Sequence, residues 1–240
     1  MPASMPRKTP GNLSPPPPAE VFARLPLGRL CRKVGGVYQR LHSRNPETGE
    51  LWPPVFFSQR GTSRFDPAEG VGTLCIADSL AGALLEMIGD QLEPVESPGR
   101  NLSPGLLAQW QVSLVSVPRS TVFETSGLNL SKLGVDLELM AGPHAVSRPW
   151  ALRLGEHPAL IDGIYHPSRH DDTRRNLALF RREHFLPAQP EPRLTPLAPD
   201  LADFAAREHG PLLYGPPIGL REHPQLYAAL IELEVGLLPE

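Results

Sequence analysis

The sequence lacks the features that mark secreted, membrane-spanning and nucleic-acid-binding proteins. It has only two cysteines, Cys31 and Cys75, which lie in neither a CxxC pair nor a zinc-ligand spacing, so neither a disulfide framework nor a zinc finger is expected. No run approaches the roughly 18 apolar residues that a membrane span needs, and the early basic residues are followed by prolines instead of an apolar signal core. A net charge of −3 gives no reason to expect a polyanionic partner. We expect a cytoplasmic protein that binds neither nucleic acid nor a membrane.

Proline is the residue type in excess. The chain has 30 prolines in 240 residues, which limits long helices and favours short strands joined by irregular loops. Its hydrophobic content of 40% is that of a globular protein, and the length favours one well-cored domain. Residues 1–24 contain few large apolar side chains, so we expect a disordered Pro-rich tail there. We expect the folded domain at 25–185 and a helical extension packed on it at 186–240.

Hydrophobic periodicity predicts the secondary structure. Alternation and short apolar runs indicate strands at 37–42, 55–57, 73–77, 109–117, 160–165 and 176–180. Pro118 is expected to end the strand at 109–117, because proline cannot donate to a strand ladder. Helices are predicted from Leu80, with Asp78 or Ser79 as the cap, and from Ser147, which is followed by a proline in the first turn. Two amphipathic segments are predicted at 200–209 and 224–235.

One acidic residue is conspicuous within the first predicted helix. Gly82, Glu86 and Gly89 fall on one face, apart from the apolar stripe that would be buried. A helical glycine costs roughly 1 kcal/mol relative to alanine, so two glycines beside one acid indicate a surface that another group approaches closely. The simpler interpretation is a solvent-exposed glutamate on a weak helix.

The polar stretch 166–172 contains residues that suit two other kinds of site. His166 and His170 have the spacing of a metal-ligand pair, but Pro167 disfavours a helix that would bring them to one face, and no third ligand is evident. Ser168 beside His170 invites nucleophilic catalysis, yet no G-x-S-x-G elbow surrounds this serine. We therefore predict neither a metal site nor a serine triad.

Several pieces of the chain, taken in order, resemble the RES domain family, which is named for an arginine, a glutamate and a serine. The resemblance extends over roughly Gly36 to Phe180. The matching pieces are Tyr38–Arg40; Pro53–Phe57 leading to Arg64 and Phe65; Gly72–Ala77 continuing into Ala83–Glu86; and Asp162–Arg169 ending in Asn176–Phe180.

The resemblance implies an α+β fold of the ADP-ribosyltransferase-like type, with a split mixed β core and flanking helices. It also implies that the protein cleaves the nicotinamide–ribose bond of NAD, as a glycohydrolase or as a phosphorylase with inorganic phosphate as co-substrate. NAD is then a substrate, and no cofactor or metal is expected. Family members often act as toxins held by a small antitoxin, so an antitoxin is an expected partner, and a homodimer is compatible with the resemblance.

The same resemblance assigns the site residues. Arg40, Glu86 and Ser168 match the arginine, glutamate and serine of the family and are the candidate catalytic residues. Arg64 matches a second arginine near the phosphates of the substrate, and Arg169 directly follows the serine.

Cys75 departs from the family pattern. Many members have a tyrosine at this position, whose ring would cover the nicotinamide, and a thiol cannot do so. Tyr38, Phe65 or Tyr165 is then the candidate for this aromatic wall. The departure leaves a second hypothesis, a protein that keeps the fold and binds a ligand or a protein partner with little or no turnover. Its partner surface would be the Pro-rich tail or the C-terminal helices.

Overall fold

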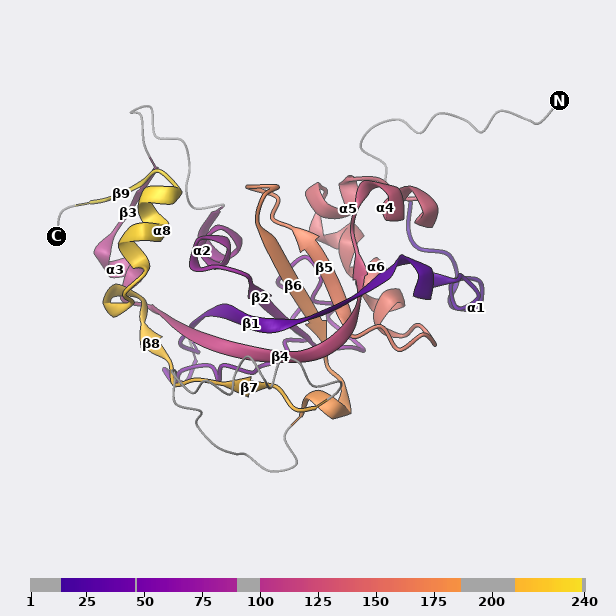
Figure 1. Ribbon diagram of the computed structural model, residues 1–240, viewed down its shortest axis with the longest axis horizontal. Helices are drawn as coiled ribbons and strands as arrows, with labels where there is room; N and C mark the ends of the chain where they lie inside the picture. The colour runs from indigo at the N-terminus through magenta and orange to yellow at the C-terminus, as the bar shows by residue number, and fades with distance from the viewer. Residues whose placement is uncertain (1–13, 46, 90–99, 187–209, 239–240) are drawn as a thin grey trace.

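Two long antiparallel strands, β1 (Cys31–Ser43) and β4 (Trp110–Glu124), form the spine of the protein (Figure 1). The computed structural model describes residues 14–45, 47–89, 100–186 and 210–238. Within these ranges the remaining strands of the main sheet are β2 (Thr73–Ala77), β5 (Gly163–Pro167), β6 (Arg175–Phe180), β7 (Leu213–Tyr214) and β8 (Ile218–Gly219).

The sheet is mixed, and β1 and β2 are almost separated. Its strand order is β1-β2-β6-β5-β4-β7, and β1 also pairs with β4. β2 pairs along its length with β6, whereas its pairing with β1 is a single pair, Gln39 with Ala77. β5 runs parallel to β4 and antiparallel to β6. The sheet therefore bends round on itself and opens between β1 and β2, in agreement with the expected split mixed core.

β4 continues past Pro118, where the sequence predicts its end. The β1–β4 register shifts between Val34–Ser120 and Gly36–Val117, so that two residues on β4, Pro118 and Arg119, oppose one on β1. This bulge takes the proline out of the regular hydrogen-bond ladder. Gly36, at a φ of 146°, supplies the backbone conformation that the irregularity requires on the other strand.

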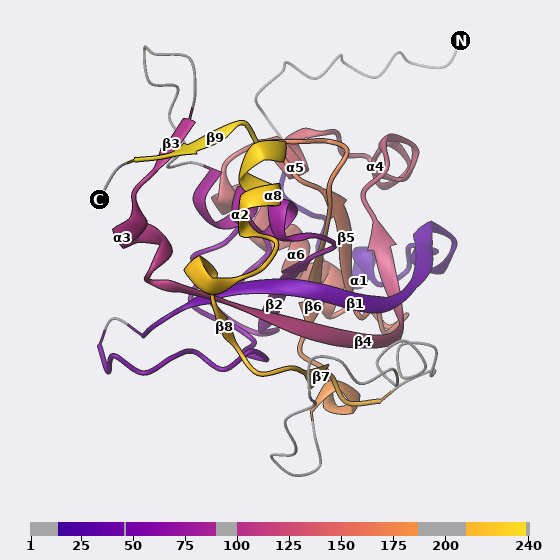
Figure 2. The same ribbon diagram turned by 60° about the vertical axis from the view of Figure 1, so that its left-hand side comes forward.

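Helices flank the sheet in two groups, as both ribbon views show (Figures 1 and 2). One group comprises α2 (Leu80–Ile88), α3 (Pro104–Leu107) and α8 (Leu226–Glu232), which share an apolar core with Leu41 and Val112 of the spine. The other comprises α1 (Ala19–Phe22), α4 (Gly127–Leu133), α5 (Glu138–Ala141) and α6 (His144–Gly155), which form a second core around Trp150. No helix of the described part is both long and apolar enough to cross a membrane.

Short elements complete the described chain. They are the 3-10 helices η1 (Leu27–Leu30), η3 (Glu183–Phe185) and η4 (Leu220–Glu222), and a separate parallel pair formed by β3 (Arg100–Leu102) and β9 (Val235–Leu237).

β1 begins at Cys31, earlier than the predicted residue 37, and three further predicted elements differ from the structure. α6 begins at His144 instead of Ser147, because Ser147 is buried and donates its hydroxyl hydrogen to the carbonyl of Leu139 (2.9 Å) instead of capping a helix. β5 begins at Gly163, since Leu160 has a φ of 50° and is 71% exposed. The segment 55–57 is an irregular loop that ends in one bridge, Ser58 with Thr73.

The C-terminal region contributes more than helices. β7 and β8 add to the outer edge of β4, so residues 213–219 belong to the main sheet. The predicted helix at 224–235 is present as α8, whereas the one at 200–209 lies outside the described residues. Arg174, in the turn between β5 and β6, donates hydrogen bonds to Glu232 of α8, to Asp171 and to Ser79 at the start of α2.

Residues before 25, the boundary that the composition predicts, already contribute to the core. Phe22 of α1 is 1% exposed and packs edge-on against Trp150 (ring centroids 5.9 Å apart) and His157 (5.7 Å). The indole Nε1 of Trp150 donates to the carbonyl of Ser14 (3.1 Å). Residues 14–24 are therefore part of the folded domain, because one large aromatic side chain is enough to anchor a proline-rich segment.

This anchoring can be measured through Phe22. Replacing it with alanine should lower the free energy of unfolding by about 3–5 kcal/mol, the usual cost of a buried Phe→Ala change. Val21, whose side chain is 53% exposed on the same helix, is the matched control, and Val21→Ala should change stability by less than about 0.5 kcal/mol. Urea denaturation followed by fluorescence gives both values. Equal stabilities for the two variants would contradict the assignment of residues 14–24 to the folded domain.

Candidate active site

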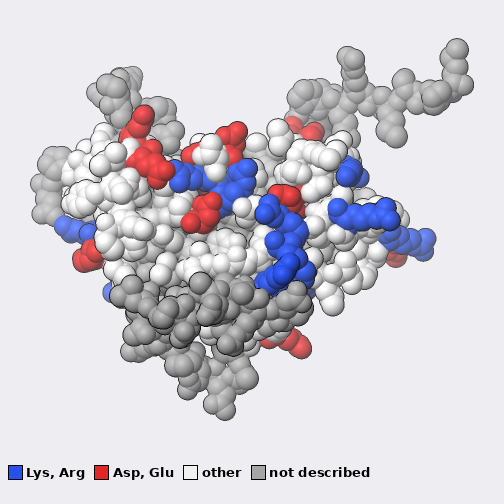
Figure 3. All heavy atoms as spheres, in the orientation of Figure 1, with Lys and Arg blue, Asp and Glu red and all other residues white. Residues whose placement is uncertain are grey.

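Lys and Arg side chains gather near the centre and right of the face seen in Figure 3, with Asp and Glu side chains beside them. The charged groups that matter for a small ligand lie in the opening between β1 and β2.

A small cavity that is open to solvent occupies this opening. The alternation of β2 creates it, because Leu74 and Ile76 pack into the core of the sheet while Ala77 faces α2 and Cys75 is exposed. The lining residues come from β1, β2, α2, β5, β6 and the loop before β2: Gln39, Leu41, Ser63, Arg64, Phe65, Cys75, Ile76, Ala77, Ala83, Glu86, His166 and Asn176.

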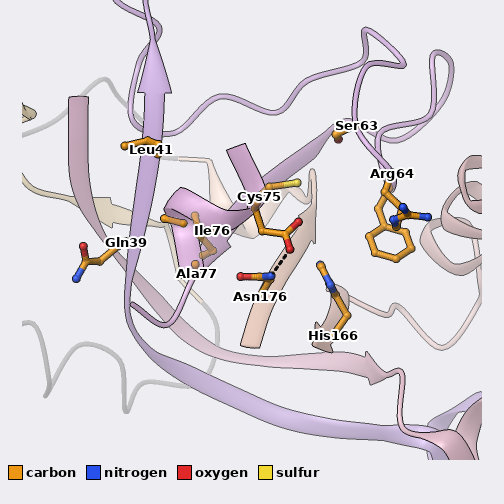
Figure 4. A pocket seen from close by; sticks show the side chains of 12 residues that line it. Gln39, Leu41, Ser63, Arg64, Cys75, Ile76, Ala77, His166 and Asn176 are labelled. Atoms are coloured by element: carbon orange, nitrogen blue, oxygen red, sulfur yellow. Dashed lines mark hydrogen bonds between the residues drawn. The ribbon is translucent and has the colours of Figure 1, made fainter. Parts of the chain in front are cut away.

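Glu86 extends from α2 into this cavity. The helix begins at Leu80 as predicted, because the Ser79 side chain caps it by accepting a hydrogen bond from the Gly82 amide (3.1 Å). Glu86 is exposed, and its Oε1 accepts a hydrogen bond from Nδ2 of Asn176 on β6 (2.8 Å), drawn as the dashed line in Figure 4. A strand residue thus holds the carboxylate of a helix residue in one orientation.

The two glycines beside Glu86 have structural roles. A side chain at Gly89 would lie 2.5 Å from Nε2 of His170, so this glycine makes room for the imidazole ring of the turn between β5 and β6. A side chain at Gly82 would meet the capping Ser79 and Ala77 at 3.2 and 3.4 Å. Other groups do approach this face of α2 closely, as the glycines predict, but these groups are side chains of the same protein and not a ligand.

Arg64 lies opposite, held by α6. Its Nη1 donates to the carbonyl of Gly142 (2.5 Å) and to Oγ of Ser147 (3.2 Å), whereas its buried Nη2 has no hydrogen-bond partner among the described residues. Burial lowers the pKa of Arg64, as does the positive charge of Arg169, and the carboxylate of Glu86 opposes this. Among the described ion pairs, none joins Arg64 to Glu86.

His166 completes the cavity and is a residue that the sequence interpretation did not assign to it. Its ring packs edge-on against Phe65 (centroids 4.9 Å apart), and its Nδ1 lies 2.9 Å from the carbonyl of Pro167. A carbonyl only accepts, so Nδ1 carries the hydrogen and Nε2 has the lone pair in the neutral ring. Burial lowers the pKa of His166, which keeps the ring neutral at pH 7.

The three aromatic candidates for a wall lie in different places. Phe65 lines the cavity. Tyr38 and Tyr165 pack into the core on the other side of the sheet, where burial raises the pKa of Tyr38 to about 12. Neither tyrosine is among the cavity-lining residues, because each points the opposite way along its strand from its neighbours Gln39 and His166.

Arg40 lies in a second cavity that adjoins the first. Leu41, Ser63 and Cys75 line both cavities. Nη1 of Arg40 donates to the carbonyl of Pro54 (2.5 Å), and burial lowers the pKa of Arg40 to about 10, so the group remains charged at neutral pH. The predicted catalytic arginine and glutamate therefore line two neighbouring cavities, and no ion pair joins them among the described residues.

Ser168 and Arg169 lie in the turn after β5. Ser168 is 3% exposed, and its Oγ accepts a hydrogen bond from the His170 amide (3.3 Å), which makes it a turn-stabilising residue in this structure. It is not among the residues that line the Glu86 cavity, so its catalytic role stays a prediction. Arg169 is exposed and close enough to Arg64 to lower the pKa of that group.

Sequence reasoning also missed Asn176 as a site residue. The β5–β6 register pairs His166 with Asn176, which brings both to the cavity side of the sheet. The available signal was a pair of polar residues within two otherwise apolar strands. In the part of the chain that the structure describes, no three His, Cys, Asp or Glu side chains come together as metal ligands.

The comparisons with known proteins agree with this geometry. A family model described as RES domain matches residues 38–200, more than half of the chain. By sequence, no curated protein gives a significant match. The crystal structure of the M. tuberculosis MbcT–MbcA toxin–antitoxin complex contains a chain with a TM-score of 0.52 and 10% identity, covering 82% of this chain and 92% of that chain. This likeness shows the fold, and the predicted ADP-ribosyltransferase-like α+β class is confirmed.

The chemistry of Cys75 yields a testable expectation. The side chain is accessible from both cavities, but the surrounding protein leaves the sulfur poorly solvated, and this desolvation together with Glu86 raises the pKa of the thiol to about 11. Its thiolate fraction at pH 8 should be roughly a hundredfold below that of an ordinary cysteine. Alkylation by iodoacetamide in a Cys31→Ser background, followed by mass spectrometry from pH 7 to 11, should show a rate that still rises above pH 10. A plateau near pH 8 would instead identify an activated thiolate.

Proposed function

The chain belongs to the RES domain family, and we propose that it is an NAD-consuming enzyme that cleaves the bond between nicotinamide and ribose. The observation that carries the proposal is one cavity in which the carboxylate of Glu86, oriented by Asn176, lies opposite the clamped guanidinium of Arg64. These are the two charges that the reaction needs, one for the ribose and one for a phosphate.

The carboxylate suits the bond that breaks. As the C1′–N1 bond cleaves, its electron pair moves to the pyridinium nitrogen, nicotinamide leaves as a neutral molecule, and C1′ acquires oxocarbenium character. A carboxylate beside that carbon, bonded to a ribose hydroxyl, stabilises the transition state more than the ground state. Asn176 holds Glu86 in place before the substrate arrives, so no reorganisation is required during the reaction.

The arginines suit the remainder of the substrate. The pyrophosphate of NAD carries two negative charges, and guanidinium groups bind such oxygens through charge-assisted hydrogen bonds. Arg64 presents Nη2 without a partner among the described residues, and Arg40 faces the adjoining cavity. Both guanidinium groups are already fixed by backbone carbonyls, which lowers the entropic cost of binding.

Water or inorganic phosphate completes the reaction. Either acceptor forms a new C1′–O bond and releases one proton, giving ADP-ribose or ADP-ribose 1-phosphate. We further propose that the protein is the toxin of a toxin–antitoxin pair, supported by the family and by the fold it shares with a chain from a toxin–antitoxin complex.

A ligand-binding protein without turnover is the second candidate. The observation that favours it is Cys75, which is exposed where the two cavities meet and leaves open the position that many relatives fill with a tyrosine. In that case NAD would bind without forming nicotinamide, and Cys75→Tyr would be the change that restores turnover.

The central prediction concerns Glu86. Purified protein should deplete NAD and release an equal amount of nicotinamide, and Glu86→Gln should slow this at least about a hundredfold, because the amide cannot stabilise the cationic transition state. Liquid chromatography with and without phosphate identifies the products. Glu69→Gln, an exposed glutamate outside both cavities, is the control and should retain wild-type activity. Unchanged NAD in both buffers would contradict the enzyme, and NAD binding by calorimetry would then support the second candidate.

Asn176 should act as a positioning residue. Asn176→Ala removes the 2.8 Å hydrogen bond to Glu86 and should lower kcat by roughly 10- to 100-fold while leaving KM for NAD within about threefold, because substrate contacts remain. Asn176→Asp places a second carboxylate beside Glu86 and should be worse than alanine at pH 7 and recover towards pH 5, as one carboxyl gains a proton. A purely structural role predicts equal pH profiles for the two variants.

A further inference from the structure

The proposed reaction releases a proton from the acceptor, and a side chain of the Glu86 cavity is suited to take it. The titratable residues that line this cavity are Arg64, Cys75, Glu86 and His166. A guanidinium has no lone pair to offer, and the Cys75 thiol, with its pKa raised to about 11, stays protonated at neutral pH. Glu86 already accepts a hydrogen bond from Asn176 (2.8 Å) and serves the cationic carbon of the ribose. Among these described lining residues, His166 is left as the base.

The hydrogen bonding of His166 turns its lone pair toward the cavity. Nδ1 lies 2.9 Å from the carbonyl oxygen of Pro167, which only accepts, so the neutral ring has its hydrogen on Nδ1 and its lone pair on Nε2. Among the described residues, Nε2 neither makes a hydrogen bond nor counts as a fully buried unpaired nitrogen, so it borders open space. The edge-on contact with Phe65, at 4.9 Å between ring centroids, holds the plane of the ring.

The position of His166 on β5 brings this lone pair to the same space as the carboxylate. The β5–β6 register pairs His166 with Asn176, whose Nδ2 donates to Glu86. Figure 4 shows the imidazole between Asn176 and Arg64, on the cavity side of β5. The carboxylate and the imidazole therefore serve two atoms of one bond, because the first stabilises the carbon and the second can take a proton from the oxygen that attacks it.

The groups around the ring keep it neutral and ready to accept a proton. Burial lowers the pKa of His166 below its ordinary value of about 6.5, and the positive charges of Arg64 and Arg175 act in the same direction. The carboxylate of Glu86 and the carbonyl of Pro167 oppose this shift. Once a proton has moved to Nε2, the negative charge of Glu86 stabilises the imidazolium until the proton passes to solvent.

We propose that His166 is the general base of the reaction and that the acceptor it serves is water. The inference rests on the proposed function. As the C1′–N1 bond breaks and its electron pair moves to nicotinamide, a lone pair of the water oxygen forms the C1′–O bond, and one water proton moves to Nε2 of His166. The proton is then released to solvent, and the product is ADP-ribose. Dianionic phosphate already carries a negative oxygen, so phosphorolysis would not depend on His166.

Kinetics of two histidine variants tests the base. His166→Gln should lower kcat for ADP-ribose formation roughly 100-fold, the usual effect of losing a general base, and leave KM for NAD within about threefold. Added imidazole should restore part of the activity of His166→Ala. His223→Gln is the control, because this buried histidine lies outside both cavities and burial lowers its pKa as well. It should retain the wild-type kcat, and thermal unfolding checks that each variant folds.

Nitrogen-15 NMR of the histidine rings examines the base without turnover. His166, assigned by its absence from the spectrum of His166→Gln, should show the Nδ1–H tautomer and a pKa below 6.5. In the wild type, kcat should fall on acidification along this titration curve, since protonation of Nε2 removes the lone pair, and His166→Gln should lose that dependence.

The outcomes separate the base from the reaction. An Nε2–H tautomer, an unchanged kcat in His166→Gln, or equal losses in the reactions with water and with phosphate would overturn the base while NAD cleavage by the wild type stands. No NAD cleavage by the wild type in either buffer would reject the proposed reaction and the base together.

Discussion

The separation of β1 from β2 is the constraint on which the rest of the structure depends. β1 pairs with β4 over almost its whole length but with β2 only at Gln39–Ala77. Because the two strands diverge on one side of that pair, Arg40 and Cys75 face open space instead of a neighbouring strand. The loop between them spans the gap, joined to β1 by the Arg44–Leu51 bridge and to β2 by the Ser58–Thr73 bridge. Complete pairing of β1 with β2 would close both cavities.

The charged groups at this opening are fixed from distant parts of the chain. Glu86 on α2 is oriented by β6, and Arg64 is clamped by the segment that leads into α6. Arg148 of α6 also donates to the carbonyl of Ser63 (3.0 Å), so the loop that carries Arg64 is attached to that helix at adjacent residues. Opposite charges that are each held by other partners do not neutralise each other, and they remain available to a substrate that carries both a cationic and an anionic part.

Much of this arrangement was accessible from the sequence. Local signals located β2, a helix cap at Asp78 or Ser79, and Glu86, because a short apolar run, a capping side chain and a helical periodicity each depend on neighbouring residues. The strand that contains Asn176 was also predicted, but the hydrogen bond from Asn176 to Glu86 was not. That bond depends on the β2–β6 and β5–β6 registers, which no single segment specifies. Pro118 failed as a stop signal for a similar reason, since a bulge depends on the partner strand as much as on the proline.

Residue type alone could not identify which aromatic side chain lines the Glu86 cavity. Tyr38, Phe65 and Tyr165 were equivalent candidates by chemistry, and strand alternation sends both tyrosines to the opposite side of the sheet. The position of Ser168 in a tight turn similarly reflects tertiary contacts, among them the His170 ring against Gly89.

The packing of α8 on α2 affects the order in which the protein assembles. The apolar side of the helix that carries Glu86 is covered by Leu226, Ala229 and Leu230, and Arg174 links Glu232 to the cap of the same helix. These contacts join segments that are far apart in the chain. Such long-range contacts form late in folding, because bringing distant segments together costs conformational entropy before the contact can stabilise the chain. During synthesis, the helix that carries Glu86 would emerge long before α8, which covers it. The Glu86 cavity is thus expected to be among the last parts to become rigid, once the C-terminal segment has folded into place.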